Sequence, residues 1–244
     1  MESLRQIFEK HNGRLLHKWE HYIEVYDAYL HKYRNTELVF LEIGVAHGGS
    51  LEMWRKYFGE KATIIGVDVN PECKKFEDGN TKVIIGSQED ENFLEGLKNE
   101  VPAVHVLLDD GGHTMKQQTM TFNSLFELVK EDGLYICEDI HTSYWKNYGG
   151  GFKKKHSFIE FSKNLIDYLH GWHAVGSDKN KIFNHLTESI YGLHYYDSIL
   201  VIEKRRIVAP QHSFKGSEQL EKHFVSFGQR RTIIKKLKDF VKSL

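Results

Sequence analysis

The chain has little of what would mark a secreted, disulfide-rich or membrane-spanning protein. Its only two cysteines, Cys73 and Cys137, lie in different segments, and Cys137 sits in an apolar run where it would pack as a small hydrophobe. No segment approaches the roughly 18 continuous apolar residues of a membrane span, and the polar N-terminus lacks the apolar core of a signal peptide. We therefore expect a cytoplasmic protein with no integral membrane span and no disulfide framework.

The sequence also lacks an excess of charge of either sign. Its 33 Lys and Arg residues balance 34 Asp and Glu residues, for a formal net charge of −1 at pH 7. Such a balance gives no global field that would attract nucleic acid or acidic partners. We expect a small-molecule substrate and no nucleic-acid partner. With 244 residues, the chain can bury a full core as one domain with appendages.

Short β-rich runs alternate with helical stretches between residues 37 and 139. The runs are LVFLEIG, TIIGVDV, KVIIG, AVHVLLD and GLYICED, separated by SLEMWRKYF and by stretches near 90–99 and 115–130. This alternation predicts an α/β fold in which a parallel sheet carries helices on both faces. SIYGLHYY and SILVIEK then flank Asp197 closely enough to predict an antiparallel hairpin at the sheet edge. The predicted core covers residues 37–205.

Helical extensions are predicted at both ends of this core. Apolar residues from Leu15 to Tyr33 recur at three- and four-residue steps, which predicts a helix in a cap over residues 1–36. Residues 206–244 are predicted to hold a basic amphipathic helix that docks on the domain or on a second subunit in preference to a membrane. A homo-oligomer is therefore left as an alternative to a monomer.

A glycine- and lysine-rich stretch from Tyr148 to Lys155 precedes a helical segment near 156–169. We expect a lid over residues 146–170. The Lys153 to Lys155 run either attracts an anionic acceptor or, as the favoured interpretation, is a solvated loop face.

Two carboxylate pairs directly follow apolar runs. Asp109 and Asp110 close the run in VHVLLDDGGH, and Glu138 and Asp139 close the run in LYICEDIH. Ligands of open α/β sheets bind beyond the carboxyl ends of the strands, so both pairs would open into one site if the two strands are neighbours. Four acidic groups would repel one another unless a cation sat among them, and Mg²⁺ prefers carboxylate oxygens. The pairs predict metal-assisted chemistry.

The motif LEIGVAHGGS predicts a strand, a glycine-bearing turn and a helix. Glycines such as Gly44 let the backbone approach a ligand, and a helix N-terminus favours polar or anionic groups. The motif does not spell G-x-G-x-x-G, which counts against an ordinary dinucleotide site. Asp68, at the end of TIIGVDV, can hydrogen-bond both hydroxyls of a ribose. Together with Glu42, these features indicate a nucleoside ligand.

Several polar residues near these motifs have two interpretations of similar weight. Ser87, Gln88 and Asp90 either reach an adenine edge or cap the next helix. Tyr144 and Trp145 either form an aromatic wall for a sugar or pack beneath the predicted lid.

Two histidines follow the carboxylate pairs and are candidate general bases. His113 is three residues beyond Asp110, and the alternative to its catalytic role is hydrogen bonding at the start of the next helix. His141, two residues beyond Asp139, is the rival base. Asp109 is assigned to a cofactor or structural role in preference to metal ligation.

The chain resembles a known family at these motifs. LEIGVAHGGS, VDV, LLDDGGH and ICEDIHTSYW occur in the order and spacing of class I, metal-dependent O-methyltransferases that act on sugars of macrolides and other natural products with S-adenosylmethionine. The chain is also similar to cephalosporin hydroxylase-like sequences, which share the same core. The resemblance covers residues 38–145 well and the hairpin at 190–204 in outline.

The resemblance implies a Rossmann-like fold with a seven-stranded, mostly parallel sheet and a C-terminal antiparallel hairpin. It implies that Asp110, Glu138 and Asp139 hold Mg²⁺ or another divalent cation, with His113 as general base. It further implies transfer of a methyl group to a hydroxyl of a sugar in natural-product or cell-surface polysaccharide biosynthesis. With the contacts suggested by the motifs themselves, the predicted S-adenosylmethionine-binding residues are Glu42, Gly44, Ser50, Asp68, Ser87, Gln88, Asp90 and Asp109.

Two other functional classes compete with this one. Asp110, His113 and His141 are residue types that hold Fe(II), which favours a hydroxylase-like oxidoreductase, although such a reaction would not need Asp68. A non-catalytic subunit that binds S-adenosylmethionine beside a catalytic partner is the second alternative, and the intact candidate ligands and base argue against it.

Overall fold

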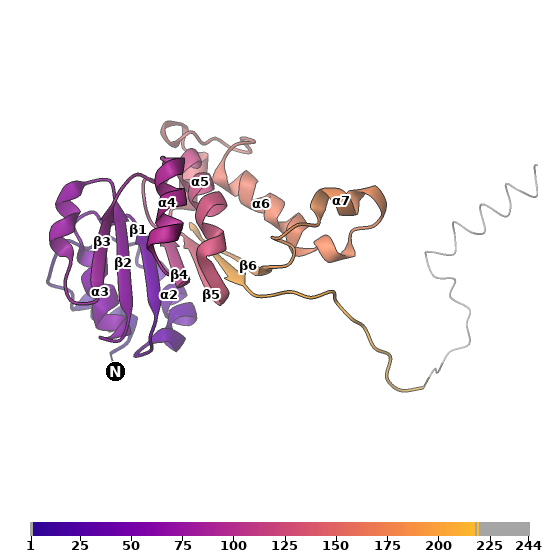
Figure 1. Ribbon diagram of the computed structural model, residues 1–244, viewed down its shortest axis with the longest axis horizontal. Helices are drawn as coiled ribbons and strands as arrows, with labels where there is room; N and C mark the ends of the chain where they lie inside the picture. The colour runs from indigo at the N-terminus through magenta and orange to yellow at the C-terminus, as the bar shows by residue number, and fades with distance from the viewer. Residues whose placement is uncertain (1, 218, 220–244) are drawn as a thin grey trace, which may run out of the picture. The chain divides into compact units, whose positions relative to one another are not determined.

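A seven-stranded sheet organises the computed structural model, which describes residues 2–217 and 219 (Figure 1). The strand order is β3-β2-β1-β4-β5-β7-β6. The first five strands are parallel, and β7 runs antiparallel to both β5 and β6. The predicted α/β fold with a C-terminal hairpin is confirmed. The strands are β1 (Val39–Ile43), β2 (Thr63–Asp68), β3 (Thr81–Ile85), β4 (Val104–Asp109), β5 (Val129–Cys137), β6 (Ile190–Tyr196) and β7 (Ile199–Lys204).

Helices cover both faces of the sheet because successive strand residues point to opposite sides. Phe40 faces the cluster formed with α1, α2 and α3, and its neighbour Leu41 faces the cluster formed with α4, α5 and α6. The helices are α1 (Leu4–Glu9), α2 (Tyr22–Leu30), α3 (Gly49–Phe58), α4 (Glu91–Glu100), α5 (Met115–Leu125), α6 (Phe158–Leu169) and α7 (Lys179–Ile182). Short 3-10 helices occupy His31–Tyr33, Pro71–Phe76, Phe126–Leu128, Ile140–Tyr144, Lys146–Tyr148, Gly171–His173 and Gly176–Asp178.

The predicted N-terminal helix is wrong in its first half. The helix α2 begins at Tyr22, and residues 10–21, here called the N-terminal strap, are not helical. The strap is held by tertiary contacts instead: the Arg14 backbone N–H donates to Glu52 Oε2 at 2.8 Å, and Arg14 Nε donates to the Gly48 carbonyl at 3.2 Å. A Cβ at Gly49 would collide with the strap backbone, so the glycine turn accommodates this close approach. Tertiary contacts therefore override the helical period of the strap.

The structure differs from the prediction at one helix boundary in the middle of the chain, and the predicted C-terminal helix lies largely outside the described residues. The helix predicted near 115–130 ends earlier, and β5 begins at Val129 and passes through a kink at Asp132, whose φ is 64°. Residues up to Ala209 form one compact unit, and the unit beyond begins at Pro210. The apolar face of the predicted basic helix, from residue 233 to 244, lies outside the described residues.

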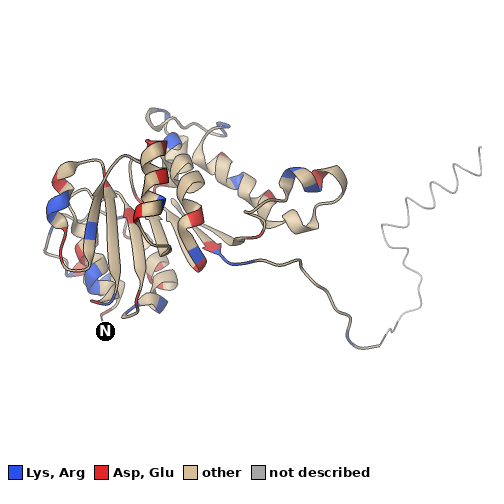
Figure 2. Ribbon diagram, viewed as in Figure 1, with Lys and Arg blue, Asp and Glu red and all other residues tan. Residues whose placement is uncertain are grey.

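The helices carry charges of both signs, in agreement with the balanced composition. Lys and Arg are interspersed with Asp and Glu along the drawn helices (Figure 2). Within the described part of the chain, no helix has both the length and the apolarity needed to cross a bilayer.

Candidate active site at the carboxyl edge of the sheet

The carboxyl ends of neighbouring strands bring the predicted motifs together. β1 lies between β2 and β4, and β4 lies beside β5, so the chain reverses its winding direction between β1 and β4. The register pairs Ile43 with Asp109 and Asp109 with Cys137. The residues that follow, Asp110 and Glu138, therefore leave the sheet side by side. Asp110, Glu138 and Asp139 open at one edge, as predicted, whereas Asp109 is buried.

A pocket with a volume of about 260 Å³, here called the Asp68 pocket, lies over the ends of β1 to β4. Asp68 Oδ2 accepts the Val45 and Ala46 backbone N–H groups, each at 2.9 Å, and Oδ1 accepts the Asn70 N–H at 2.8 Å. Asp68 thus shapes the glycine turn as well as lining the pocket. The residues that line it are Ile43, Gly44, Ala46, Val67, Asp68, Val69, Gly86, Ser87, Gln88, Asp110, Gly111, Gly112 and Gln117.

Of the four predicted cofactor contacts Ser87, Gln88, Asp90 and Asp109, the first two line the Asp68 pocket and the other two do not. Ser87 and Gln88 line the Asp68 pocket, and Gln88 Oε1 also accepts the Gly112 N–H at 2.7 Å. Asp90 does not line it and caps α4 by accepting the Asn92 and Phe93 N–H groups. Asp109 is buried behind the pocket, where it accepts from Gln88 Nε2 at 3.1 Å. Asp90 thus caps α4 and Asp109 holds Gln88 in place, and a cofactor contact by either residue stays a prediction.

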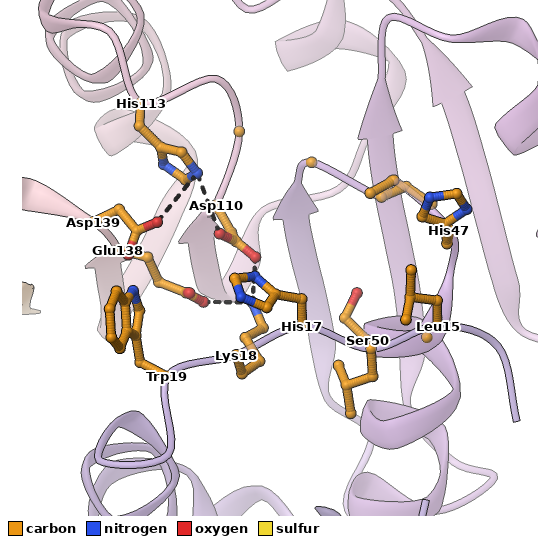
Figure 3. A pocket seen from close by; sticks show the side chains of 16 residues that line it. Leu15, His17, Lys18, Trp19, His47, Ser50, Asp110, His113, Glu138 and Asp139 are labelled. Carbon is orange, nitrogen blue, oxygen red and sulfur yellow. Dashed lines mark hydrogen bonds and ion pairs between the residues drawn. The ribbon is translucent and has the colours of Figure 1, made fainter. Parts of the chain in front are cut away.

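A second pocket, here called the acidic pocket, lies beside the first and has a volume of about 230 Å³ (Figure 3). Both pockets are lined by Gly44, Ala46, Asp110 and Gly111. Gly44 has a φ of 96°, and a Cβ there would collide with the Asp110 carbonyl, so the turn after β1 needs glycine to pack against the end of β4. The pockets thus meet at the sheet's reversal point. The acidic pocket is also lined by Leu15, Leu16, His17, Lys18, Trp19, Val45, His47, Gly49, Ser50, His113, Glu138 and Asp139.

The strap places the ammonium of Lys18 among the carboxylates, which sequence reasoning missed. Lys18 Nζ donates to Glu138 Oε1 at 2.6 Å and to Asp110 Oδ2 (Figure 3). It also lies 3.8 Å from Glu42 Oε1. The Lys18 side chain is 1% exposed. Although burial disfavours its charge, Asp110, Glu138 and Glu42 raise the pKa of Lys18, so the ammonium is charged. A buried lysine of this kind is stable only because its charge is paired.

Two tyrosines of α2 hold the other ends of the carboxylate cluster. Tyr22 Oη donates to Asp139 Oδ1 at 2.7 Å, and Tyr26 Oη donates to Glu138 Oε1. Burial and the adjacent carboxylates raise the pKa values of both tyrosines, which keeps the hydroxyls protonated as donors. Asp139 adopts a left-handed backbone conformation with φ 53° as the chain turns away from β5.

Burial dominates the electrostatics of the cluster. It raises the pKa of Glu42 to about 7, that of Asp110 to about 6 and that of Glu138 to about 8, and in each case Lys18 opposes the rise. Glu42 lines neither pocket; it accepts from Ser50 Oγ at 2.8 Å and from Trp54 Nε1 at 3.1 Å. Glu42 therefore supports the site from beneath, and Ser50 lines the acidic pocket.

The two candidate bases differ in position. His113 Nε2 points into the acidic pocket, 3.5 Å from Asp139 Oδ2 and 3.7 Å from Asp110 Oδ1 (Figure 3). His141 does not line that pocket, and its ring makes an edge contact with Trp145 at a centroid distance of 4.6 Å. Burial lowers the pKa of His113, against the effect of Asp139. The iron-binding set of Asp110, His113 and His141 is not assembled in the described residues.

The acidic pocket fits a hard divalent cation in its chemistry. Among residues 2–217 and 219, no three His, Cys, Asp or Glu side chains are already drawn around a single metal position. However, carboxylate oxygens are the ligands that Mg²⁺ prefers. Asp110, Glu138 and Asp139 all line this pocket, so its walls offer the oxygen donors that such an ion takes.

The region outside the pockets bears on two other predictions. Tyr144 and Trp145 are about half exposed, and the Trp145 ring contacts that of Tyr148 at a centroid distance of 5.6 Å, so both interpretations of these two residues stay open. Lys153, Lys154 and Lys155 are exposed, which agrees with a solvated loop face. A lid movement of this segment stays a prediction.

Comparison with known proteins identifies relatives for most of the chain, although no family model matches it. It is 31% identical over 191 residues to mycinamicin VI 2''-O-methyltransferase of Micromonospora griseorubida, covering 74% of this chain and 47% of that protein. It is 30% identical over 189 residues to demethylmacrocin O-methyltransferase of Streptomyces fradiae, covering 73% of this chain and 47% of that protein. The chain spans about half the length of the curated relatives it matches.

A solved structure shares the architecture. The MycE methyltransferase from the mycinamycin biosynthetic pathway, in complex with Mg and SAH, superimposes with a TM-score of 0.77 at 28% identity, covering 84% of this chain and 55% of that chain. A second structure of MycE contains Mg, SAH and mycinamycin VI and superimposes with a TM-score of 0.75 at 27% identity. The sheet, its terminal hairpin and the flanking helices are common to these proteins and to this chain.

Proposed function

The chain is a relative of the macrolide-sugar O-methyltransferases and has their class I methyltransferase fold, and from this premise we propose that it transfers a methyl group from S-adenosylmethionine to a hydroxyl of a small molecule. The observation that carries the proposal is the pair of adjoining pockets. A methyl donor in the Asp68 pocket and an acceptor in the acidic pocket would meet at the wall shared by Gly44, Ala46, Asp110 and Gly111.

The cofactor side of the proposal rests on the Asp68 pocket. Asp68 holds the turn after β1 with two backbone hydrogen bonds and still faces the pocket, where its carboxylate can bind ribose hydroxyls. Ser87 and Gln88 line the adjacent wall, where the adenine would lie. The MycE structures, which contain SAH, support this choice of cofactor.

The acceptor side of the proposal rests on the acidic pocket and its three candidate metal ligands. Asp110, Glu138 and Asp139 would hold Mg²⁺ or another divalent cation. When bound, the cation would supply Lewis-acid chemistry that lowers the pKa of an acceptor hydroxyl. Mg in the MycE structures supports the choice of ion. Lys18, Tyr22 and Tyr26 hold the carboxylates from the opposite side.

His113 is the proposed general base. Its Nε2 atom faces the acidic pocket, where it would take the proton from the acceptor hydroxyl, and Asp139 would stabilise the imidazolium that results. The two pockets would hold donor and acceptor in line, which lowers the entropic cost of the transfer. His141 lies outside the pocket and is assigned no proton transfer.

The proposed acceptor is a sugar, either attached to a natural product or part of a cell-surface polysaccharide. The names of the relatives support a natural-product sugar for those proteins. Trp19 lines the acidic pocket and is 49% exposed, which gives a sugar ring an aromatic surface on which to stack. We also propose a cytoplasmic location and assembly into a homo-oligomer.

The test is calorimetric titration with S-adenosylmethionine and S-adenosylhomocysteine, followed by incubation with hydroxylated acceptors and Mg²⁺. We expect micromolar binding that Asp68→Ala abolishes and an acceptor product heavier by one methylene. Asp90→Ala is the matched control because Asp90 makes similar hydrogen bonds to backbone N–H groups but lines neither pocket. A wild-type protein that binds neither nucleoside would refute the methyltransferase proposal.

A further inference from the structure

We propose that Lys18, Tyr22 and Tyr26 form a clamp that orients the three carboxylates of the acidic pocket toward a divalent cation. The inference rests on the proposed function for the identity of the cation. It assigns to the N-terminal part of the chain a positioning role that goes beyond that function: the clamp residues act through Asp110, Glu138 and Asp139 and not on the acceptor.

Each carboxylate is held by the clamp through one of its two oxygens. Asp110 uses Oδ2 to accept from Lys18. Glu138 uses Oε1 to accept from both Lys18 and Tyr26. Asp139 uses Oδ1 to accept from Tyr22. Three donors from one short stretch of the chain therefore fix the orientation of three acceptors at two strand ends.

The second oxygen of each carboxylate stays available on the pocket side. In the described part of the chain, no hydrogen-bond donor contacts Asp110 Oδ1, Glu138 Oε2 or Asp139 Oδ2. His113 Nε2 lies between two of them, at 3.7 Å from Asp110 Oδ1 and 3.5 Å from Asp139 Oδ2. One anchored and one free oxygen per carboxylate is the pattern by which outer-shell donors orient metal ligands.

The clamp residues come from the strap and from one face of α2. Tyr22 and Tyr26 are one helical turn apart on α2, and Lys18 lies in the strap, four residues before Tyr22. Both tyrosine rings are buried, and Tyr26 makes an edge contact with Trp54 at a centroid distance of 5.2 Å. Phenylalanine could fill such sites without a polar atom, so the tyrosine hydroxyls serve the carboxylates.

The single positive charge of Lys18 leaves room for a divalent cation in the acidic pocket. Three carboxylates, those of Asp110, Glu138 and Glu42, lie within 4 Å of this one ammonium, and Asp139 follows Glu138 at the same edge of the sheet. When these carboxylates are ionised, the single positive charge of Lys18 leaves a net negative charge that a divalent cation would offset. Lys18 is therefore expected to partner the metal ion, lying on the oxygens that the ion does not use, and not to replace it.

The experiment is a titration of the full chain with Mn²⁺, followed by electron paramagnetic resonance, and with Mg²⁺, followed by calorimetry. Wild type is compared with Tyr22→Phe, Tyr26→Phe, Lys18→Met and Lys18→Arg. Outer-shell donors typically contribute about 10- to 100-fold to metal affinity, so we expect a loss of that size in the first three variants. Lys18→Arg should restore most of the affinity because it keeps the charged donor.

Two controls separate positioning from a general loss of structure. Tyr57→Phe removes a buried hydroxyl that donates to Asp27 at 2.6 Å, away from both pockets, and should leave cation affinity unchanged. S-adenosylhomocysteine affinity, measured without cation, should stay at the wild-type value in every variant, which shows that the Asp68 pocket is intact.

The outcomes separate the clamp from the proposed function. Weaker cation binding with unchanged nucleoside binding supports the clamp. Wild-type affinity in all three variants overturns the clamp alone, and tighter binding in Lys18→Met overturns it by showing that Lys18 competes with the ion. A wild-type protein that binds no divalent cation overturns both the clamp and the metal-dependent part of the proposed function.

Discussion

The two pockets at the carboxyl edge share a wall but are built in different ways. The Asp68 pocket is made of strand ends and the turns that follow them, and backbone N–H groups satisfy its central carboxylate. The acidic pocket uses two strand ends as well, but its carboxylates are satisfied by side chains from the strap and α2, far away in sequence. Local motifs define the first pocket, whereas long-range contacts complete the second.

This difference in construction suggests a difference in task. A pocket shaped by the backbone presents a fixed surface to a ligand, as nucleoside sites in open α/β sheets do. A pocket of buried carboxylates held by an ammonium and two phenols keeps negative charge available for a cation. The predictions below test whether the two pockets can be disabled separately.

The largest expected effect is that of Asp110→Asn, which would break the acidic pocket alone. The substitution removes a proposed metal ligand and the partner of Lys18, so we expect methyl transfer to fall by about 10⁴-fold or more. S-adenosylhomocysteine should still bind, because Asp110 contributes only a shared wall to the Asp68 pocket. Initial rates and calorimetry on the same preparation check both statements, and a coupled loss of nucleoside binding would contradict the separation.

A chelator should reproduce that loss in the wild-type protein. Removal of divalent cations is expected to abolish methyl transfer while nucleoside binding persists, and added Mg²⁺ should restore the rate. Full activity in excess chelator would show that Lys18 is the only cation that the acidic pocket needs.

A smaller loss is expected for His113→Gln, which sharpens the comparison within the acidic pocket. Removal of a general base typically lowers a rate by about 10²- to 10⁴-fold. Mg²⁺ and S-adenosylhomocysteine should bind nearly as in wild type, because His113 is not a proposed metal ligand and does not line the Asp68 pocket. His141→Gln serves as the matched control, and an equal loss there would reassign the base.

A still smaller effect, on stability alone, is expected for Asp90→Ala. Loss of a helix N-cap costs about 1 kcal/mol, so the free energy of unfolding in urea should fall by that amount. Nucleoside affinity should not change because Asp90 lines neither pocket. Weaker nucleoside binding would move Asp90 back among the cofactor contacts.

The smallest effect concerns pH and a histidine remote from both pockets. Burial, together with Lys130, lowers the pKa of His105, whose Nδ1 accepts the Val39 N–H at 2.9 Å. The unfolded chain then binds a proton more readily, so stability is complete above pH about 6.5 and declines as pH falls below that value. His105→Asn should weaken this decline in thermal unfolding scans between pH 7 and 5, and an unchanged slope would exclude His105 as its source.

The strands and their terminal carboxylates could be predicted because their signals are local. The alternation of β-rich runs with helical stretches, and the placing of Asp68, Asp110 and Glu138 at strand ends, can be read from neighbouring residues alone. The fold follows from that pattern with few alternatives. Its parallel register then brings Asp110 and Glu138 together.

Lys18 could not be predicted in this way because its partners are 92 and 120 residues away. The apolar period of Leu15, Leu16 and Trp19 predicts a helix there, and only tertiary contacts pull the strap across the site. One signal was available: four carboxylates at two neighbouring strand ends require a cation, and Lys18 lies between the apolar residues Leu16 and Trp19.

The central claim, that the two pockets bind different ligands, is tested most directly by a crossed titration. Asp68→Ala and Asp110→Asn are each titrated with S-adenosylhomocysteine and with Mn²⁺. We predict that Asp68→Ala loses the nucleoside and keeps the cation, while Asp110→Asn loses the cation and keeps the nucleoside. Loss of both ligands in each variant, with both proteins still folded, would contradict the claim and indicate a single undivided site.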